Sequence, residues 1–147
     1  MTATFSHVGI SVVSLERSIA FYRDLLGMEV VEEVTFKGER YEAILALKGA
    51  RGRIAILKSG NLAVELFEFA EPAPKPADRT RPVSDHGITH VAVEVDDIQA
   101  LYDRLKAAGV SFHCAPIRFP ACATATYARD PDGNVVEILQ PVAAGSE

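Results

Sequence analysis

The 147-residue sequence predicts an α+β protein built from two copies of one β-α-β-β-β module. The prediction rests on two duplicated phrases. An apolar run with a lone His occurs at residues 6–12 and again at 89–95, and an apolar run with a lone Glu occurs at 61–66 and again at 133–138. Each half of the chain is therefore expected to begin with a strand that bears a His and to end with a strand that bears a Glu.

A helix is expected after each His strand, because apolar residues recur there at spacings of three and four. In the first half, Ser14 is the expected N-cap and Gly27 follows the helix. In the second half, Asp96 is the expected N-cap, Gln99 has the spacing of a capping box with it, and Gly109 follows the helix. The two apolar stripes are Leu15, Ile19, Tyr22 and Leu26, and then Ile98, Leu101, Leu105 and Ala108.

Three further extended segments are expected in each half, at residues 29–34, 42–47 and 62–69 and at residues 111–113, 124–129 and 134–140. Residues 70–86 hold half of the eight prolines and predict a stiff, extended linker. A module of this size is marginal for folding alone, so one domain with a shared core is expected. Its parts are module 1 at about 5–69, the linker at 70–86, module 2 at about 87–141 and a C-terminal tail at 142–147.

Composition indicates an ordinary globular domain, with 48% hydrophobic residues and a net charge of −5. Dispersed Lys and Arg form no basic stripe, so no nucleic-acid partner is expected. No signal peptide or membrane-spanning run is recognisable, which favours a cytoplasmic protein without a membrane partner. Cys114 and Cys122 are interpreted as free thiols that pack in the interior.

His7, Glu65, His90 and Glu137 are the candidate functional residues. A lone His in an apolar strand is usually a core residue, and a lone Glu usually faces water. Strand alternation, however, gives both Glu residues apolar neighbours, and a buried carboxylate needs a partner. Two imidazoles and two carboxylates at repeat-related positions favour a divalent metal site.

The pattern resembles the vicinal oxygen chelate superfamily, which includes glyoxalases, bleomycin-resistance proteins and dioxygenases. The matching motifs lie at residues 7–10, 18–28, 90–98 and 130–138, and the resemblance extends from about residue 5 to 141. It implies two βαβββ modules that form one curved, mixed, eight-stranded sheet around a metal cleft. It also implies that His7, Glu65, His90 and Glu137 are the metal ligands.

A metal with these four ligands retains two open positions, which suit a small-molecule substrate with two vicinal oxygens. One divalent ion per chain (Ni, Co, Zn, Mn or Fe) would stabilise an enediolate, while Glu65 or Glu137 takes the proton. The expected activity is thus that of a metal-dependent lyase or isomerase. Glyoxalase I (lactoylglutathione lyase) and methylmalonyl-CoA epimerase have similar ligand sets.

Two alternatives remain from the sequence. An extradiol-type ring-cleaving dioxygenase would hold Fe(II) with His7, His90 and Glu137, but it has no protein ligand where Glu65 stands. A small-molecule binding or resistance protein without catalysis would not need four metal ligands.

Substrate contacts are expected from side chains that flank the four ligands. Bacterial glyoxalase I proteins often have Arg and Asn for glutathione where this chain has Ser11 and Phe69. Strand edges and a curved apolar face, at which the family commonly dimerises, favour a homodimer. The candidate substrate-binding residues are Phe67, Phe69, Phe119 and Tyr127 for an apolar pocket, Glu94 in the cleft, and Arg118 or Arg129 for an anionic substrate tail.

Overall fold

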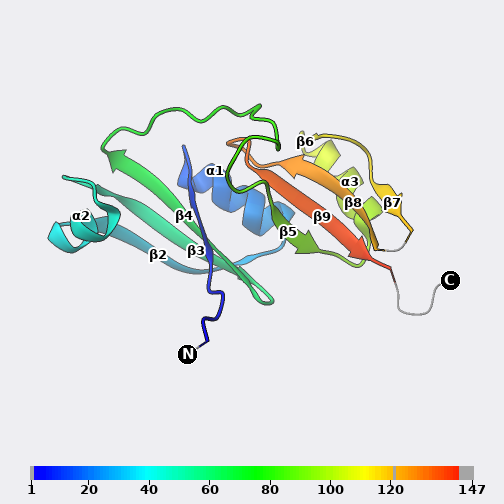
Figure 1. The fold of residues 1–147 in the computed structure, drawn as a ribbon, viewed down its shortest axis with the longest axis horizontal. Coiled ribbons are helices and arrows are strands. Elements are labelled where there is room, and N and C mark those ends of the chain that lie inside the picture. Colours follow the sequence, from blue (N-terminus) through cyan, green and yellow to red (C-terminus); the bar gives the residue numbers. More distant parts are fainter. Residues whose placement is uncertain (1, 121, 143–147) are drawn as a thin grey trace. The chain divides into compact units, whose positions relative to one another are not determined.

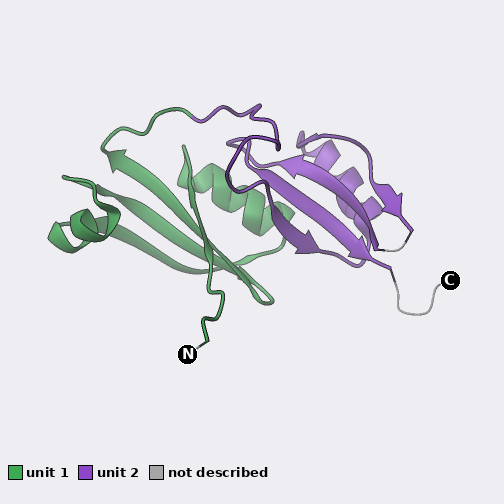
Figure 2. Cartoon of the chain, in the orientation of Figure 1, with its two compact units in different colours: residues 1–76 green, residues 77–147 purple. Residues whose placement is uncertain are grey.

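The computed structural model describes residues 2–120 and 122–142. The chain forms two compact units, residues 1–76 and residues 77–147 (Figure 2). The boundary falls inside the proline-rich segment that the sequence predicts as a linker. Residues 143–147 of the predicted C-terminal tail lie outside the described residues.

Unit 1 contains one mixed sheet with the strand order β1-β4-β3-β2 (Figure 1). β1 is parallel to β4, and the other two pairings are antiparallel. The elements are β1 (Val8–Ser11), α1 (Leu15–Ile19), the π-helix η1 (Ala20–Leu25), β2 (Glu29–Lys37), α2 (Glu39–Leu45), β3 (Arg51–Ser59) and β4 (Leu62–Glu71).

Unit 2 repeats this arrangement with the strand order β5-β9-β8-β6, and a short additional strand, β7, also pairs with β8. β5 is parallel to β9, as β1 is to β4. The α+β class and the two βαβββ modules are therefore confirmed, with α2 inserted in the first module and β7 in the second. The elements are β5 (Val91–Glu94), α3 (Ile98–Ala107), β6 (Ser111–Phe112), β7 (Ile117–Phe119), β8 (Ala123–Arg129) and β9 (Val135–Pro141).

The two predicted amphipathic helices are present, and most residues of their predicted apolar stripes are buried. The exceptions are Leu26, which is half-buried, and Ala108, which lies just past α3 and is exposed. Leu15 and Tyr22 are 1% and 2% exposed in the first module, and Leu105 is fully buried in the second. Ser14 accepts a hydrogen bond from the Arg17 backbone N–H, so it is the predicted N-cap. Gly27 and Gly109 have φ values of 78° and 84°, the left-handed conformation expected just past a helix.

The predicted N-cap of the second helix is wrong by one residue. Asp97, not Asp96, accepts from the backbone N–H of Ala100. Gln99 does not complete a capping box, because its amide donates to Asp103 one turn later in the helix. From the sequence alone, the adjacent residues Asp96 and Asp97 are equally good N-cap candidates. The helix begins at the buried residue Ile98, so Asp97, which directly precedes it, is the cap.

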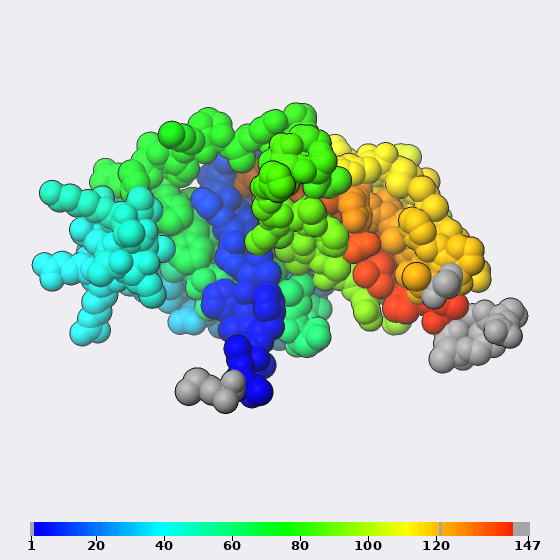
Figure 3. Space-filling view, viewed as in Figure 1, coloured from blue at the N-terminus to red at the C-terminus, as the bar shows by residue number. Residues whose placement is uncertain are grey.

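The predicted strand at 42–47 is also wrong, since residues 39–45 form helix α2. Tyr41 and Leu45, one helical turn apart, pack against a cluster around Phe36, and this contact favours the helical spacing. No residue of α2 is buried, and the segment protrudes from the surface of unit 1 (Figure 3, cyan).

Strand β3 is absent from the sequence-based prediction although it pairs with both β2 and β4. Its middle contains the buried side chains of Ile54, Ala55 and Leu57, a continuous apolar run without the alternation of a half-exposed strand. A Cβ on Gly52 would overlap the carbonyl oxygen of Glu68, so only glycine allows this close approach of β3 to β4.

Both cysteines are free thiols, as predicted, but both are exposed. The prediction that they pack in the interior is therefore wrong. The structure places Cys114 just after β6 and Cys122 just before β8, at the ends of a sheet where side chains are not covered. No helix among residues 2–120 and 122–142 is long and apolar enough to cross a membrane.

Candidate metal centre

In unit 1, the predicted ligands His7 and Glu65 lie next to each other. His7 immediately precedes β1. Gly9, two residues further along the chain, is in register with Glu65 on the parallel strand β4. The imidazole Nε2 of His7 lies 3.3 Å from Oε2 of Glu65. The Glu65 side chain is 21% exposed and that of His7 is 47% exposed, so a ligand can reach both groups.

In unit 2, His90 and Glu137 form an equivalent pair. His90 immediately precedes β5, and Ala92 is in register with Glu137 on the parallel strand β9. Nε2 of His90 lies 3.1 Å from Oε2 of Glu137, and the two side chains are 29% and 21% exposed. The internal repeat therefore produces the same His–Glu geometry in each unit.

A hydroxyl group lies beside the second ring nitrogen of each histidine, which the sequence-based prediction does not include. Ser6 Oγ lies 3.0 Å from Nδ1 of His7, and Thr89 Oγ1 lies 2.9 Å from Nδ1 of His90. When Nδ1–H donates to the hydroxyl oxygen, Nε2 presents its lone pair toward the carboxylate side, as a metal ligand requires. The signal in the sequence is that Ser or Thr directly precedes both histidines.

The two pairs differ in one neighbour. Tyr127 on β8 is in register with Glu137, and its hydroxyl lies 3.4 Å from Nδ1 of His90. In unit 1, Ile56 on β3 is in register with Glu65. The His90–Glu137 pair therefore has a phenol beside it at the position where the His7–Glu65 pair has an aliphatic side chain.

His113 is another contact of Tyr127, with the centroids of the two rings 5.7 Å apart. Burial, and then the negative charge of Glu137, raise the pKa of Tyr127 above its ordinary value. Partial desolvation of the ring, and then the positive charge of Arg129, lower the pKa of His113. Both shifts favour neutral side chains next to the His90–Glu137 pair at neutral pH.

The predicted aromatic contacts lie in different surroundings. Phe67 and Phe69 are half-buried in unit 1, where their rings stack 5.7 Å apart and pack against the Phe36 cluster. Phe119 on β7 is 52% exposed. Tyr127 is the member of the predicted apolar set that contacts a predicted metal ligand.

The charged residues predicted to bind substrate are mostly at the surface. Glu94 on β5 and Arg118 on β7 are exposed. Arg129 donates hydrogen bonds to the carbonyl oxygens of Gly133 and Arg81, which ties the end of the predicted linker to the turn before β9.

Each pair supplies one nitrogen and one oxygen donor, a set that suits borderline divalent ions such as Zn, Ni, Co, Mn and Fe. Within neither unit do the described residues gather three or more His, Cys, Asp or Glu side chains that could hold a metal ion. The binding of all four side chains to one ion stays a prediction.

Comparison with known proteins identifies the family. Residues 4–138 match the sequence model of the Glyoxalase/Bleomycin resistance protein/Dioxygenase superfamily. The chain belongs to this superfamily. The match spans both modules, which confirms the resemblance inferred from the sequence motifs.

Individual relatives support this assignment. The chain is 28% identical over 141 residues to lactoylglutathione lyase of Haemophilus influenzae, which covers 91% of this chain and 90% of that protein. It is 32% identical over 136 residues to the uncharacterized protein YaeR of Escherichia coli, covering 91% and 93%. A crystal structure of a glyoxalase family protein from Bacillus cereus matches with a TM-score of 0.89 and 25% identity, covering 97% of each chain.

Proposed function

We propose that this glyoxalase-superfamily protein is a divalent-metal-dependent lyase or isomerase of the glyoxalase I or epimerase type. The observation that carries the proposal is the duplicated His–Glu pair, with Nε2–Oε2 distances of 3.3 Å and 3.1 Å. The similarity to a lactoylglutathione lyase supports an enzyme of this class.

His7, Glu65, His90 and Glu137 would hold one divalent ion per chain, either Ni, Co, Zn, Mn or Fe. The neighbouring hydroxyls of Ser6 and Thr89 fit this role, because they orient the imidazole rings from the side opposite the carboxylates. When bound, the ion supplies Lewis acidity toward the two vicinal oxygens of a small-molecule substrate.

Glu65 and Glu137 are the candidate bases. Each carboxylate is 21% exposed, so it is accessible to a substrate yet partly shielded from water. A carboxylate in this position takes a proton from the carbon next to the substrate carbonyl and returns it to a neighbouring atom, which results in isomerisation. We propose Phe67, Phe69, Phe119, Tyr127, Glu94 and Arg118 as substrate-binding residues of the same site.

One observation favours a second candidate function, an extradiol-type ring-cleaving dioxygenase. The ring of Tyr127 lies next to that of His90, and the ring of His113 lies next to that of Tyr127, so both side chains could contact a phenolic substrate. That enzyme would use His7, His90 and Glu137 with Fe(II), and Glu65 would have no role in it. A third candidate, a binding or resistance protein without catalysis, leaves both carboxylates without a role.

A substrate panel distinguishes these functions. Purified protein loaded with Ni, Co, Zn or, without oxygen, Fe(II) would be incubated with methylglyoxal and glutathione, with methylmalonyl-CoA, and with catechols. We expect exchange of the substrate α-hydrogen with deuterated water in the absence of oxygen, measured by NMR. Oxygen uptake with a catechol and a yellow ring-cleavage product would instead establish the dioxygenase function.

We also propose a homodimer. Exposed apolar side chains on strands β2 and β7 support it, since Val31 and Ile117 are 45% and 49% exposed. Sedimentation equilibrium at micromolar concentration should give twice the 15.9 kDa chain mass. A single species with the chain mass at all concentrations would contradict the proposal.

A cytoplasmic location agrees with the two free, exposed thiols of Cys114 and Cys122. Exposed thiols persist in a reducing compartment and tend to oxidise outside it. Cell fractionation with an antibody against the protein would test this location.

A further inference from the structure

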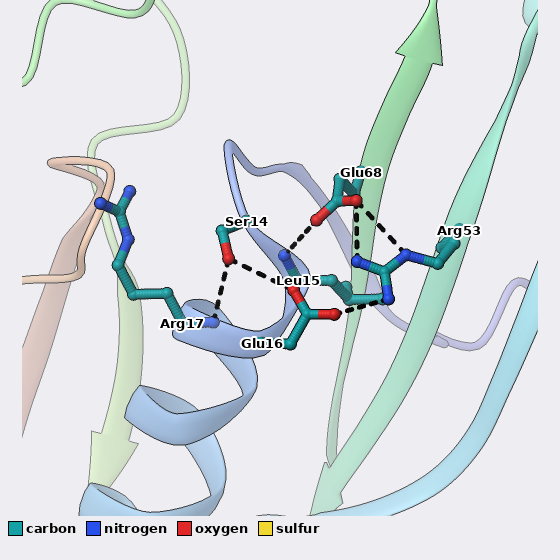
Figure 4. A network of polar contacts seen from close by, with 6 residues as sticks. All are labelled: Ser14, Leu15, Glu16, Arg17, Arg53 and Glu68. Carbon is teal, nitrogen blue, oxygen red and sulfur yellow. Dashed lines mark hydrogen bonds and ion pairs between the residues drawn. The ribbon is translucent and has the colours of Figure 1, made fainter.

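The strand that carries Glu65 also holds the beginning of a helix. Glu68 follows Glu65 by three residues on β4, and its Oε2 accepts a hydrogen bond of 2.6 Å from the backbone N–H of Leu15 (Figure 4). Leu15 is the first residue of α1, whose first N–H groups have no partner within the helix. The carboxylate of Glu68 therefore ties the helix that follows β1 to strand β4.

The second module repeats this contact with a different side chain. Gln140 follows Glu137 by three residues on β9, and its Oε1 accepts a hydrogen bond of 3.0 Å from the N–H of Ile98. Ile98 is the first residue of α3. Leu15 and Ile98 follow His7 and His90 by the same eight positions, so the contact belongs to the repeat that places the four candidate ligands.

A backbone hydrogen bond is also repeated in the connection between each His strand and the helix that follows it. The N–H of Val12 donates to Phe67 O over 2.8 Å, and the N–H of Val95 donates to Leu139 O over 2.9 Å. In each module the connection from the His strand to the helix is thus bonded to the Glu strand twice, first through the backbone and then through Glu68 or Gln140.

These contacts matter because the His strands are short. β1 and β5 have four residues each, and among the described residues of each unit they pair only with β4 and β9. A shift by one residue moves a strand by about 3.3 Å and turns its side chains to the other face. Such a shift in β1 or β5 would separate each His from its Glu.

Because of the three-residue spacing, the candidate metal ligand and the side chain that holds the helix lie on opposite faces of one strand. Side chains alternate between faces, so Glu65 and Glu68 point to opposite sides of β4, and Glu137 and Gln140 to opposite sides of β9. Glu68 and Gln140 can therefore hold the helices without contacting a ligand bound at the His–Glu pairs.

The first contact is embedded in an ion-pair network, whereas the second is made by the neutral amide of Gln140. Arg53 on β3 donates to Oε1 of Glu68 over 2.8 Å and to Oε1 of Glu16 over 2.6 Å (Figure 4). The hydrogen bond from Arg53 keeps the pKa of Glu16 at about 2, so Glu16 is ionised at neutral pH. Arg53 leaves Oε2 of Glu68 to the helix, whereas the neutral Gln140 needs no such partner.

We propose that Glu68 and Gln140 are positioning residues, which hold each His strand in register with its Glu strand by fixing the helix that follows it. The importance of that register for metal binding rests on the proposed function. The hydrogen-bonded link itself can be tested without any metal.

The test compares four single variants with the wild-type protein. Glu68→Ala and Gln140→Ala remove the acceptor for the helix, whereas Glu68→Gln retains it without the charge. Glu71→Ala is the matched control, because Glu71 makes an exposed ion pair with Arg51 across the same two strands. The measurements are amide hydrogen exchange of Val12 and Val95 by NMR in metal-free protein, and Co(II) affinity by competition with a chelator.

We expect Glu68→Ala to speed exchange at Val12, and Gln140→Ala to speed exchange at Val95, each by at least about tenfold. We expect Co(II) affinity to fall by about tenfold in both variants, the lower end of the range for residues that orient metal ligands. Glu68→Gln should stay within about twofold of wild type in both measurements, because Gln still provides the oxygen that accepts the helix N–H. Glu71→Ala should also stay within about twofold, because it leaves that hydrogen bond in place.

Unchanged exchange at Val12 and Val95 in folded Ala variants would overturn the positioning role. If Glu71→Ala speeds exchange as much as Glu68→Ala does, the positioning role is overturned as well, because the result would indicate general loosening of the sheet. If Glu68→Ala does not fold, Gln140→Ala decides. If wild-type protein binds no Co(II) but the exchange pattern is as expected, the positioning role stands and the proposed metal site fails.

Discussion

Replacing both His7 and His90 by alanine is expected to reduce bound divalent metal from about one ion per chain to less than about a tenth of that value. Each change removes the nitrogen donor that lies within 3.3 Å or 3.1 Å of a candidate carboxylate ligand. Two carboxylates alone bind a borderline divalent ion weakly compared with a mixed nitrogen and oxygen set. Elemental analysis after dialysis against metal-free buffer provides the measurement.

The other two histidines supply a matched control. The chain has four His residues, and neither His86 nor His113 belongs to a His–Glu pair. The His86→Ala/His113→Ala double variant should retain its metal. Full metal content in the His7/His90 variant, or equal loss in both double variants, would contradict the proposed site.

Changing Glu137 to Gln is expected to slow α-hydrogen exchange of a substrate by about 10²–10⁴-fold, the usual contribution of a general base. The amide can still provide an oxygen ligand, but it cannot take a proton. Substrate affinity should change much less than the exchange rate. The exchange rate is measured by NMR in deuterated water, and substrate affinity by calorimetry on the same preparation.

Two further variants make this result specific. Glu71→Gln changes an exposed carboxylate at the end of strand β4, which pairs with Arg51, and should leave exchange unchanged. Glu65→Gln tests the carboxylate of the other pair, which has Ile56 in register with it in place of Tyr127. A wild-type exchange rate in both Glu65→Gln and Glu137→Gln would exclude proton transfer by either carboxylate.

The positions of the candidate ligands illustrate what local sequence patterns predict well. Glu65 and Glu137 lie inside apolar strands, as the duplicated phrases indicate, and His7 and His90 lie one residue before the strands that were expected to bear them. The helix after each His strand was also predictable, because its apolar stripe and its flanking glycine are local signals. These features depend on residues that are close together in the chain.

Residues 39–59 illustrate where local patterns fail. The segment at 39–45 contains both an apolar run and a helical spacing, and packing of Tyr41 and Leu45 on the Phe36 cluster favours the helix. The strand β3 that follows has a continuous apolar core with flanking basic residues, which is ambiguous as a pattern. Its place beside β4 depends on Gly52, where any side chain would overlap the Glu68 carbonyl.

By itself, the sequence determined the family, the two βαβββ modules and the four candidate metal ligands, because the internal repeat records all three in short, duplicated phrases. Only the tertiary structure decided which neighbours those ligands have. Tyr127 lies beside Glu137, and Glu68 and Gln140 reach the N–H groups of Leu15 and Ile98, because of strand register and helix placement. Register is set by hydrogen bonds between residues far apart in the chain, so no local pattern of residues specifies it.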